Sequence, residues 1–443
     1  MTTLLKNATI VNEKTIFEGD VLIKGGHIER IDRDISDENA SVMDIKGKYL
    51  LPGVIDDQVH FREPGLTHKG NIASESRAAV AGGITSFMEQ PNTKPQTVTI
   101  ELLEDKFKRA ENTSFANYSF LFGGTNDNLE ELKRLDKKAC SGIKLFLGSS
   151  TGNMLVDDEK VIEAIFSNTE MVISAHCEDE GTIRANLEIF REKFGEDIPI
   201  GNHPLIRSEE ACYLSSSKAI SLARKTGARL HVFHLSTGKE THLFRNDVPL
   251  AEKKITAEVC IHHLWFSDAD YAQKGTFIKW NPAVKTALDR QQLWEALLDD
   301  RIDVIATDHA PHTLDEKRNI YTKAPSGGPL VQHALPAMLE KHHEGMVSLE
   351  TIVQKMCHNP ALLFDIEKRG FVREGYFADL VAVDLNAAWE VSKANIAYKC
   401  GWSPFEGKRF KSKVCHTFVN GHLAYDNGTF NEQPFGQRLT FDR

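Results

Sequence analysis

The middle of the chain alternates short apolar runs with longer amphipathic stretches. Eight runs rich in β-branched and aromatic residues fall at 54–61, 84–90, 118–122, 143–147, 171–175, 230–235, 255–260 and 302–307. Between them apolar residues recur at helical spacing, for example over 72–81, 129–135, 209–224 and 290–298. Alternating strands and helices predict a parallel sheet, and eight repeats favour its closure into a (β/α)8 barrel. An open, doubly wound sheet is the alternative that this pattern leaves.

Both ends of the chain have a different pattern. Short β-type runs separated by turns occupy 4–11, 20–23, 27–31 and 41–45, with a hairpin signal at Gly25-Gly26. Near the other end, 378–383 and 414–425 are again strand-like, and Asn420-Gly421 is typical of a tight hairpin turn. We therefore expect residues 1–51 and 368–443 to form one small β domain beside a barrel of residues 52–367.

Polar residues stand where the predicted barrel strands end. In a (β/α)8 barrel the loops at the carboxyl ends of the strands carry the active site. A single histidine in a strand is most often a core residue, but several polar residues at the same end of successive strands are harder to explain in that way. Three imidazoles, a carboxylate and a lysine at one barrel mouth have the composition of a metal site. The residues concerned are His60, Asn92, Lys144, His176, His234 and Asp308.

Other histidines of these runs are expected to have different roles. His231 precedes His234 by three positions, and this odd spacing places the two side chains on opposite faces of a strand. We expect His231 to lie in the core. His262 and His263 follow the seventh run, where they could support metal ligands from behind.

Composition narrows the class of protein. The formal net charge is -10 and no basic run is longer than a few residues, which argues against binding to nucleic acid. No stretch reaches the ~20 apolar residues of a membrane helix, and the first residues lead directly into a strand-like run. The seven cysteines are scattered without a Cys-x-x-Cys pair, so neither a disulfide framework nor a cysteine-rich zinc site is expected. We expect a cytoplasmic enzyme that acts on a small molecule.

Several motifs resemble those of one enzyme family. They read LPG at 51–53, DQVHFREPG at 57–65, QPNT at 90–93, ATDHAPH at 306–312, EGYFADL at 374–380 and KCGWSPFEG at 399–407. In this order, spread over the whole chain, they are similar to the signatures of the dihydroorotases in the amidohydrolase superfamily. The resemblance implies a (β/α)8 metallohydrolase that reversibly converts L-dihydroorotate to N-carbamoyl-L-aspartate in pyrimidine biosynthesis.

The resemblance also implies the roles of individual residues. His60, His176 and His234 match zinc ligands of the family. Lys144 matches a carboxylated lysine that bridges two metals, and Asp308 matches a ligand that also moves a proton. The lysine assignment is chemically reasonable, because a lysine buried in a strand loses its proton easily and a neutral amine can add CO2.

Substrate choice rests, by the same resemblance, on Arg62, Asn92 and His312, which match the residues that bind the substrate carboxylate. A guanidinium holds a carboxylate with two parallel hydrogen bonds. Related enzymes that cleave hydantoin or allantoin have uncharged substrates at this point and little use for an arginine. Asn281 is a further candidate site residue whose role stays open.

The chain departs from the family pattern in its first strand. The family has His-x-His, whereas this chain has Gln58 two positions before His60. Asp57 should face the other way, and Asp56 lies about 13 Å along the strand from His60, too far to share a metal with it. Because zinc prefers nitrogen and anionic donors to an amide oxygen, we expect one tightly held zinc and a second that is held loosely.

Several alternatives stay open at this point. The substrate could be another cyclic amide, as in hydantoinases and allantoinases. The chain could also be a catalytically silent barrel that supports another pyrimidine enzyme, although the retained ligand set argues against this. Long loops at 148–154 and 313–328 are either lids over the site or plain surface loops. The oligomeric state is undetermined, with a homodimer as one candidate.

Overall fold

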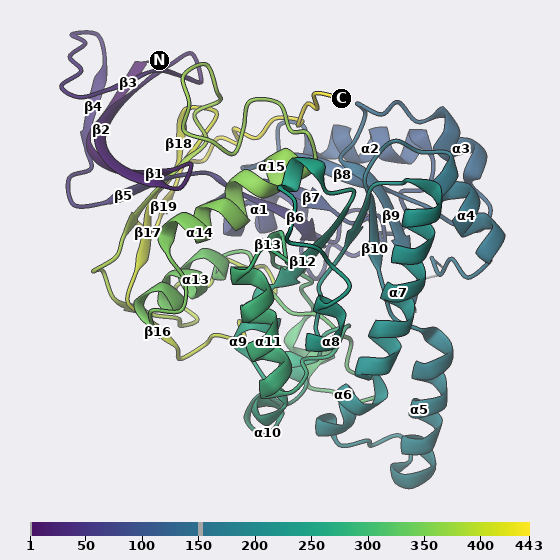
Figure 1. Ribbon diagram of the computed structural model, residues 1–443. Helices are drawn as coiled ribbons and strands as arrows, with labels where there is room; N and C mark the ends of the chain where they lie inside the picture. The colour runs from purple at the N-terminus through teal and green to yellow at the C-terminus, as the bar shows by residue number, and fades with distance from the viewer. Residues whose placement is uncertain (1, 149–153) are drawn as a thin grey trace.

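The computed structural model describes residues 2–148 and 154–443, so the loop predicted at 148–154 falls almost entirely outside it. An eight-stranded sheet organises the middle of the chain (Figure 1). Each of the eight predicted apolar runs overlaps one of its strands. The strands are β6 (Val54–Val59), β7 (Ile84–Glu89), β8 (Asn117–Gly123), β9 (Gly142–Phe146), β10 (Ile173–His176), β11 (Leu230–Val232), β12 (Ile255–Cys260) and β13 (Val304–Ala306).

The sheet closes on itself. Its strands follow one another in chain order from β6 to β13, and each neighbouring pair is parallel. Closure occurs just beyond β13, where Val59 forms a bridge with His309 and the His60 amide donates to the His309 carbonyl at 2.6 Å. The predicted (β/α)8 barrel is therefore confirmed, and the open sheet is excluded.

Helices connect the strands and cover the outside of the barrel. Their caps come from the sequence: Asn71 and Thr286 accept hydrogen bonds at the starts of α1 and α11, and Gly227 ends α7 with φ of 74°. None of the helices in the described parts of the chain has the length and hydropathy to cross a membrane. The α-helices are α1 (Ile72–Ala81), α2 (Ile100–Ala110), α3 (Leu129–Arg134), α4 (Glu159–Ser167), α5 (Glu180–Phe194), α6 (His203–Ile206), α7 (Glu209–Thr226), α8 (Gly238–Thr241), α9 (Ile261–Trp265), α10 (Tyr271–Lys274), α11 (Ala287–Leu298), α12 (Leu314–Lys317), α13 (Ala334–His343), α14 (Leu349–Val353) and α15 (Asn359–Leu363).

Strands from both chain ends form a second sheet beside the barrel, at the left of Figure 1. N-terminal β5 pairs antiparallel with C-terminal β14, with Pro52 opposite Leu380. The expected meeting of the two ends in one sheet is thus confirmed. Its strands are β1 (Thr2–Asn12), β2 (Thr15–Lys24), β3 (His27–Asp32), β4 (Ser41–Asp44), β5 (Tyr49–Pro52), β14 (Leu380–Asp384), β17 (Lys413–Val419), β18 (His422–Asp426) and β19 (Thr429–Phe430), while β15 (Trp389–Glu390) and β16 (Arg409–Phe410) pair separately.

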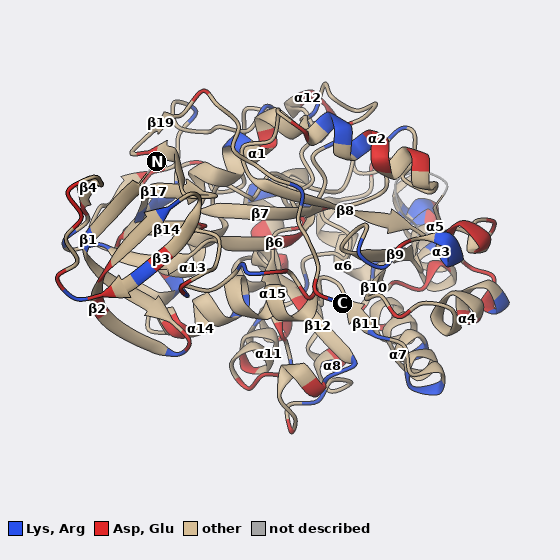
Figure 2. Cartoon of the chain, turned by 90° about the horizontal axis from the view of Figure 1, so that it is seen from above, with Lys and Arg blue, Asp and Glu red and all other residues tan. Residues whose placement is uncertain are grey.

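The last residues of the chain return to the barrel. The Tyr118 amide donates to the Gln437 carbonyl at 2.9 Å, and the Leu439 amide donates back to the Tyr118 carbonyl at 2.9 Å. Leu439 and Phe441 pack in one apolar cluster with Ile55 of β6. Figure 2 shows the C-terminus lying over the barrel strands, between β6 and β12. The C-terminal segment therefore covers the end of the barrel opposite the predicted active site.

Candidate active site at the barrel mouth

A cavity of about 240 Å³ opens at the carboxyl ends of the barrel strands. His312 lies directly behind it, with Nε2 3.0 Å from Nη2 of Arg62. The fold thus gathers all of the predicted site residues, which come from six barrel strands or the turns that follow them and, for Asn281, from the connection between β12 and α11. The predicted residues that line the cavity itself are Gln58, His60, Arg62, Asn92, Lys144, His176, His234, Asn281 and Asp308.

His60 is held between an amide and a carboxylate. Its Nδ1 lies 2.8 Å from Oδ1 of Asn92, and its Nε2 lies 3.2 Å from Oδ1 of Asp308. Since the amide oxygen only accepts hydrogen bonds, Nδ1 carries the proton and Nε2 turns its lone pair toward the carboxylate. Burial lowers the pKa of His60, which keeps the imidazole neutral at pH 7. Two facing electron-pair donors of this kind suit a bound cation.

A second pair of imidazoles lies at the ends of β10 and β11. Nδ1 of His176 is 3.0 Å from Nε2 of His234, and the rings meet edge to face. On its other side, Nε2 of His176 is 3.0 Å from Oε2 of Glu178, which orients the ring. Burial lowers the pKa of both histidines, that of His234 well below its usual range. Neutral imidazole is the form that binds metals.

Lys144 is buried on β9 between aromatic rings. Its Nζ lies 4.1 Å from the ring centre of Phe233 and 4.8 Å from that of Phe146. Burial lowers the pKa of Lys144 to about 7, which makes the neutral amine accessible near neutral pH. Among the described residues Nζ has no hydrogen-bond partner. A neutral, unpartnered amine is the form that can add CO2.

Three of the site residues have a backbone conformation that is rare outside glycine. Arg62, His234 and Asp308 have φ of 73°, 41° and 49°, all in the left-handed region. Each follows a barrel strand, where the turn directs its side chain toward the cavity. Such conformations cost of order 1–3 kcal/mol each and cluster at functional sites. Other residues with positive φ lie elsewhere in the chain, so the conformation is consistent with a functional site here but does not identify one by itself.

Residues 49–424 match the amidohydrolase family. The chain belongs to this family. It is 33% identical over 426 residues to a dihydroorotase of Halobacterium salinarum, covering 95% of this chain and 97% of the relative. It is 31% identical to a dihydroorotase of Pediococcus pentosaceus, with 96% of this chain and 99% of the relative covered. Among solved structures, L-hydantoinase (dihydropyrimidinase) from Arthrobacter aurescens is similar, with a TM-score of 0.94, 29% identity, and 99% and 100% of the two chains covered.

The donors of this amidohydrolase fit a divalent metal. Besides Nζ of Lys144, the buried Nδ1 of His234 has no hydrogen-bond partner among the described residues. Unpartnered polar atoms are costly inside a protein unless a ligand completes them. Neutral imidazoles and a carboxylate are the donors that zinc prefers.

Arg62 contributes a buried positive charge to the same cavity. Its Nε donates to the Pro311 carbonyl at 3.1 Å, and its Nη2 contacts His312. Within the described residues no carboxylate forms an ion pair with Arg62. Lys69 lies behind His312, with Nζ 2.9 Å from Nδ1 of His312, and its charge is paired with Glu316 at 2.8 Å. This part of the amidohydrolase cavity therefore favours an anionic group on the substrate.

Gln58 occupies the place of the missing family histidine. It is buried, lines the cavity, and accepts a hydrogen bond at 3.5 Å from Sγ of Cys260. Asp56 is engaged elsewhere, because its carboxylate accepts from the Thr307 hydroxyl at 2.6 Å. Asp57 points away from the cavity toward His231, and the core position predicted for His231 is also observed.

Sequence reasoning missed other residues of the cavity wall. Arg207 lines the cavity and pairs with Glu178, the residue that orients His176. Although burial alone would raise it, Arg207 and His176 lower the pKa of Glu178 to about 2. Arg207 follows the short helix α6, where no motif or strand end marks it. Phe146 also lines the cavity. It lies two positions after Lys144 on β9, so the alternation of side chains along a strand places both on the same face and could have revealed it.

The loop after α12 forms another wall and is firmly attached. Residues 325–327 line the cavity. Nζ of buried Lys317 donates to the carbonyls of Lys279, Pro325 and Gly327 at 3.3, 2.9 and 2.7 Å. Nζ of Lys279 donates to the carbonyls of Tyr321 and Ala324 at 2.6 and 2.7 Å. These anchors favour a fixed wall over a lid for the predicted loop 313–328.

Proposed function

We propose that this amidohydrolase is a dihydroorotase, which reversibly hydrolyses dihydroorotate to N-carbamoyl-aspartate and operates toward ring closure in cytoplasmic pyrimidine biosynthesis. The observation that carries the proposal is Arg62, a buried guanidinium without a carboxylate partner, in the same cavity as the donor set. A cyclic amide that bears a carboxylate would place its carboxylate at Arg62 and its ring amide at the donor set. The names of the relatives at 31–33% identity support the same substrate.

Two groups of residues would hold the metal. We assign one zinc to His176, His234 and a carboxylated Lys144. A second, weaker zinc would use His60, Asp308 and the same lysine. When bound, zinc polarises a carbonyl and lowers the pKa of water from 15.7 to about 7. Burial, which lowers the pKa of all three histidines and so favours their neutral form, supports this assignment.

The chain's own residues then orient the substrate and move a proton. Arg62, Asn92 and His312 bind the substrate carboxylate, which directs the ring amide toward the base of the cavity. The Asp308 carboxylate takes a proton from the attacking water and delivers it to the departing amide nitrogen. In ring closure Asp308 takes the proton from the nitrogen instead. Asn281 lines the cavity beside this path and keeps no assigned role.

A hydantoinase is the second candidate, because the structural similarity to L-hydantoinase is high. The ring of hydantoin carries no carboxylate for Arg62, so the charge would be left buried without use. A silent barrel is the third candidate, and the complete set of His60, Lys144, His176, His234 and Asp308 argues against it.

The experiment is a substrate comparison with matched metal analysis. Purified protein, with zinc bound, is assayed with dihydroorotate, N-carbamoyl-aspartate, hydantoin and allantoin. We expect turnover of the first two only, in both directions. Turnover of hydantoin above that of dihydroorotate would assign the hydantoinase function, and no turnover of any substrate by the zinc-bound protein would favour the silent barrel.

The oligomeric state is a separate question, and a homodimer stays a prediction.

A further inference from the structure

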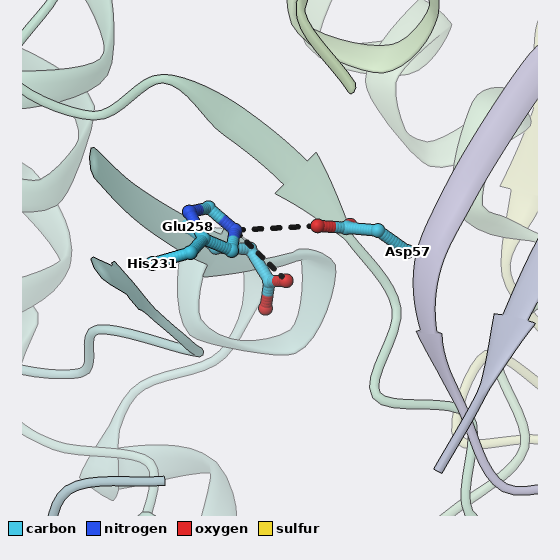
Figure 3. A group of neighbouring side chains, drawn as sticks. All are labelled: Asp57, His231 and Glu258. Carbon is cyan, nitrogen blue, oxygen red and sulfur yellow. Dashed lines mark ion pairs between the residues drawn. The ribbon is translucent and has the colours of Figure 1, made fainter. Parts of the chain in front are cut away.

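Three ionisable side chains meet inside the barrel, away from the cavity. They are Asp57 of β6, His231 of β11 and Glu258 of β12 (Figure 3). All three are fully buried. None of them lines the mouth cavity. Glu258 reaches toward the mouth through one oxygen only, since Oε1 accepts from the backbone amide of His234 at 3.1 Å.

The three side chains converge on one point. Nε2 of His231 lies 3.2 Å from Oδ2 of Asp57 and 3.8 Å from Oε2 of Glu258. One ligand atom from each residue lies within 4.8 Å of the others. In a tetrahedral zinc site with bonds of about 2.0–2.1 Å, ligand atoms are separated by roughly 3.3–3.4 Å. The two distances from Nε2 of His231, 3.2 and 3.8 Å, are near this value, and the two carboxylates lie within 4.8 Å of each other, so a small shift of the side chains would let all three contact one small cation.

The converging atoms have no other partners. Among the described residues no hydrogen bond ends on Oδ1 or Oδ2 of Asp57, on Oε2 of Glu258 or on Nε2 of His231. Such atoms are nearly always satisfied in a protein interior. Because Nε2 of His231 faces Oδ2 of Asp57 and Oε2 of Glu258, a single bound ligand would complete these three atoms.

The histidine is oriented to bind a cation. Its Nδ1 lies 2.8 Å from the hydroxyl oxygen of Thr256, and that hydroxyl donates to the Leu230 carbonyl at 3.4 Å. The hydroxyl oxygen is therefore free to accept from Nδ1–H, and Nε2 faces the two carboxylates. Although burial alone would lower it, these carboxylates raise the pKa of His231 to about 9, so a bound cation would replace a proton on Nε2. A hydrogen bond on the outer nitrogen that fixes the ring in this way is the usual support of a metal-binding histidine.

Charge balance points to a divalent cation. Neither carboxylate forms an ion pair with a lysine or arginine among the described residues, and His231 is their shared neighbour. Two buried carboxylates at this separation repel each other strongly in a medium of low polarity. A doubly charged cation neutralises both. One imidazole and two carboxylates are donors for zinc and neighbouring first-row metals.

We propose that Asp57, His231 and Glu258 form a second, inner site for one divalent transition-metal ion of the zinc type, separate from the centre at the barrel mouth. The two sites share no ligand. The inner ion ties β6 to β11 and β12 across the barrel interior, beneath the strand ends that carry His60 and His234. The proposal is independent of the substrate assigned to the mouth.

The test locates zinc directly. Crystals of the full chain with zinc bound are measured on both sides of the zinc absorption edge. We expect one anomalous peak among Asp57, His231 and Glu258 in addition to density at the mouth. Asp57→Asn removes one carboxylate charge with little change in shape, and it should lose the inner peak and about one zinc per chain while keeping the mouth peak. His176→Asn should instead lose the zinc assigned to His176 and His234 at the mouth and keep the inner peak.

Asp56→Asn is the matched control, because it alters the neighbouring buried carboxylate without touching the cluster. A mouth peak without an inner peak in the unmodified protein overturns the proposal and identifies the cluster as an ion pair around a protonated His231. Absence of zinc at both sites overturns it as well. The map of the unmodified protein decides the outcome even if a variant does not fold.

Discussion

Arg62 combines burial, a left-handed backbone and a charge without a carboxylate partner. The strained backbone and the buried charge both cost free energy in the folded protein, and the hydrogen bond to the Pro311 carbonyl does not neutralise the charge. A substrate carboxylate would offset the charge. We therefore expect Arg62, held by the strained backbone at the end of β6, to select substrates that carry a carboxylate.

Removal of this charge tests that link. Arg62→Met should keep the metal content but lower kcat/KM for dihydroorotate about 10- to 100-fold or more, since a charged hydrogen bond contributes ~1.5–3 kcal/mol. Steady-state kinetics and metal analysis measure the two effects. Arg109→Met, on the exposed surface of α2, is the control. Near-normal turnover by Arg62→Met is incompatible with the proposed clamp.

The low pKa of Lys144 predicts a pH dependence of its modification. The folded-state pKa is lowered from 10.5 to about 7, so the neutral amine dominates above pH 7 and becomes scarce below it. Reactivation of chelator-treated protein by zinc and bicarbonate should slow about tenfold for each pH unit below 7. The rate is measured at several pH values below and above 7.

Lys144→Ala supplies the control for this experiment. It should lose metal and activity, and bicarbonate should not restore them at any pH. Small carboxylic acids at high concentration should restore part of both, because they replace the bridging carboxylate. A bare amine at Lys144 in a high-resolution structure of the fully metallated enzyme contradicts carboxylation.

Gln58 predicts unequal metal affinities at the mouth. The His60 side has an amide where the family has an imidazole, so its zinc should dialyse away first. Gln58→His should retain that zinc longer, as measured by metal content during dialysis against a chelator. Equal retention of both mouth metals in the unmodified protein contradicts the argument. The same dialysis is repeated with Asp57→Asn, which should lack the inner zinc, so that only the mouth metals are counted.

At the scale of elements, the wall at 325–327 depends on Lys317. The carbonyls that it binds would lose their buried donor in Lys317→Met, at about 1–3 kcal/mol for each unsatisfied group. We expect a higher KM and a lower thermal midpoint, with a smaller change in kcat. Lys323→Met, at an exposed position of the same loop, should change neither. A lid that opens freely would instead show an unchanged KM in both variants.

The elements themselves were largely predictable. Periodicity located all eight barrel strands, because each is buried on both faces and reads as an apolar run. The strand ends then indicated His60, His176 and His234 without any structure. Arg207 could not be found in this way, since it reaches the cavity from a short helix whose position depends on packing over long distances. The inner cluster likewise depends on how distant strands are aligned across the barrel.

At the scale of the molecule, buried polar contacts join the small sheet to the barrel. Arg369 pairs with Asp379, which also accepts from Nδ2 of Asn117 on β8 at 3.0 Å. Asn420 completes the network by donating to Asn117 at 2.7 Å. The sheet made from both chain ends is thus held to the barrel by specific contacts as well as by apolar packing.

Loss of this junction should lower stability without affecting chemistry. Arg369→Met leaves Asp379 as an uncompensated buried charge and should cost ~3–5 kcal/mol of unfolding free energy. Arg373→Met, four positions further along the chain, breaks an exposed pair with Glu13 and should cost about 1 kcal/mol or less. Thermal midpoints and kcat are compared for both. Equal destabilisation by the two variants would contradict the role of the buried network.

The pairing of β5 with β14 also has a consequence for biosynthesis on the ribosome. More than 300 residues separate Pro52 from its partner Leu380. At about 5–20 residues per second, β5 waits on the order of tens of seconds for its neighbour to be made. During that time it presents an unpaired apolar edge of the kind that invites aggregation. The nascent chain should therefore depend on a ribosome-associated chaperone or on slow growth at low temperature, and a circular permutant that starts within the barrel and joins Met1 to Arg443 should need neither.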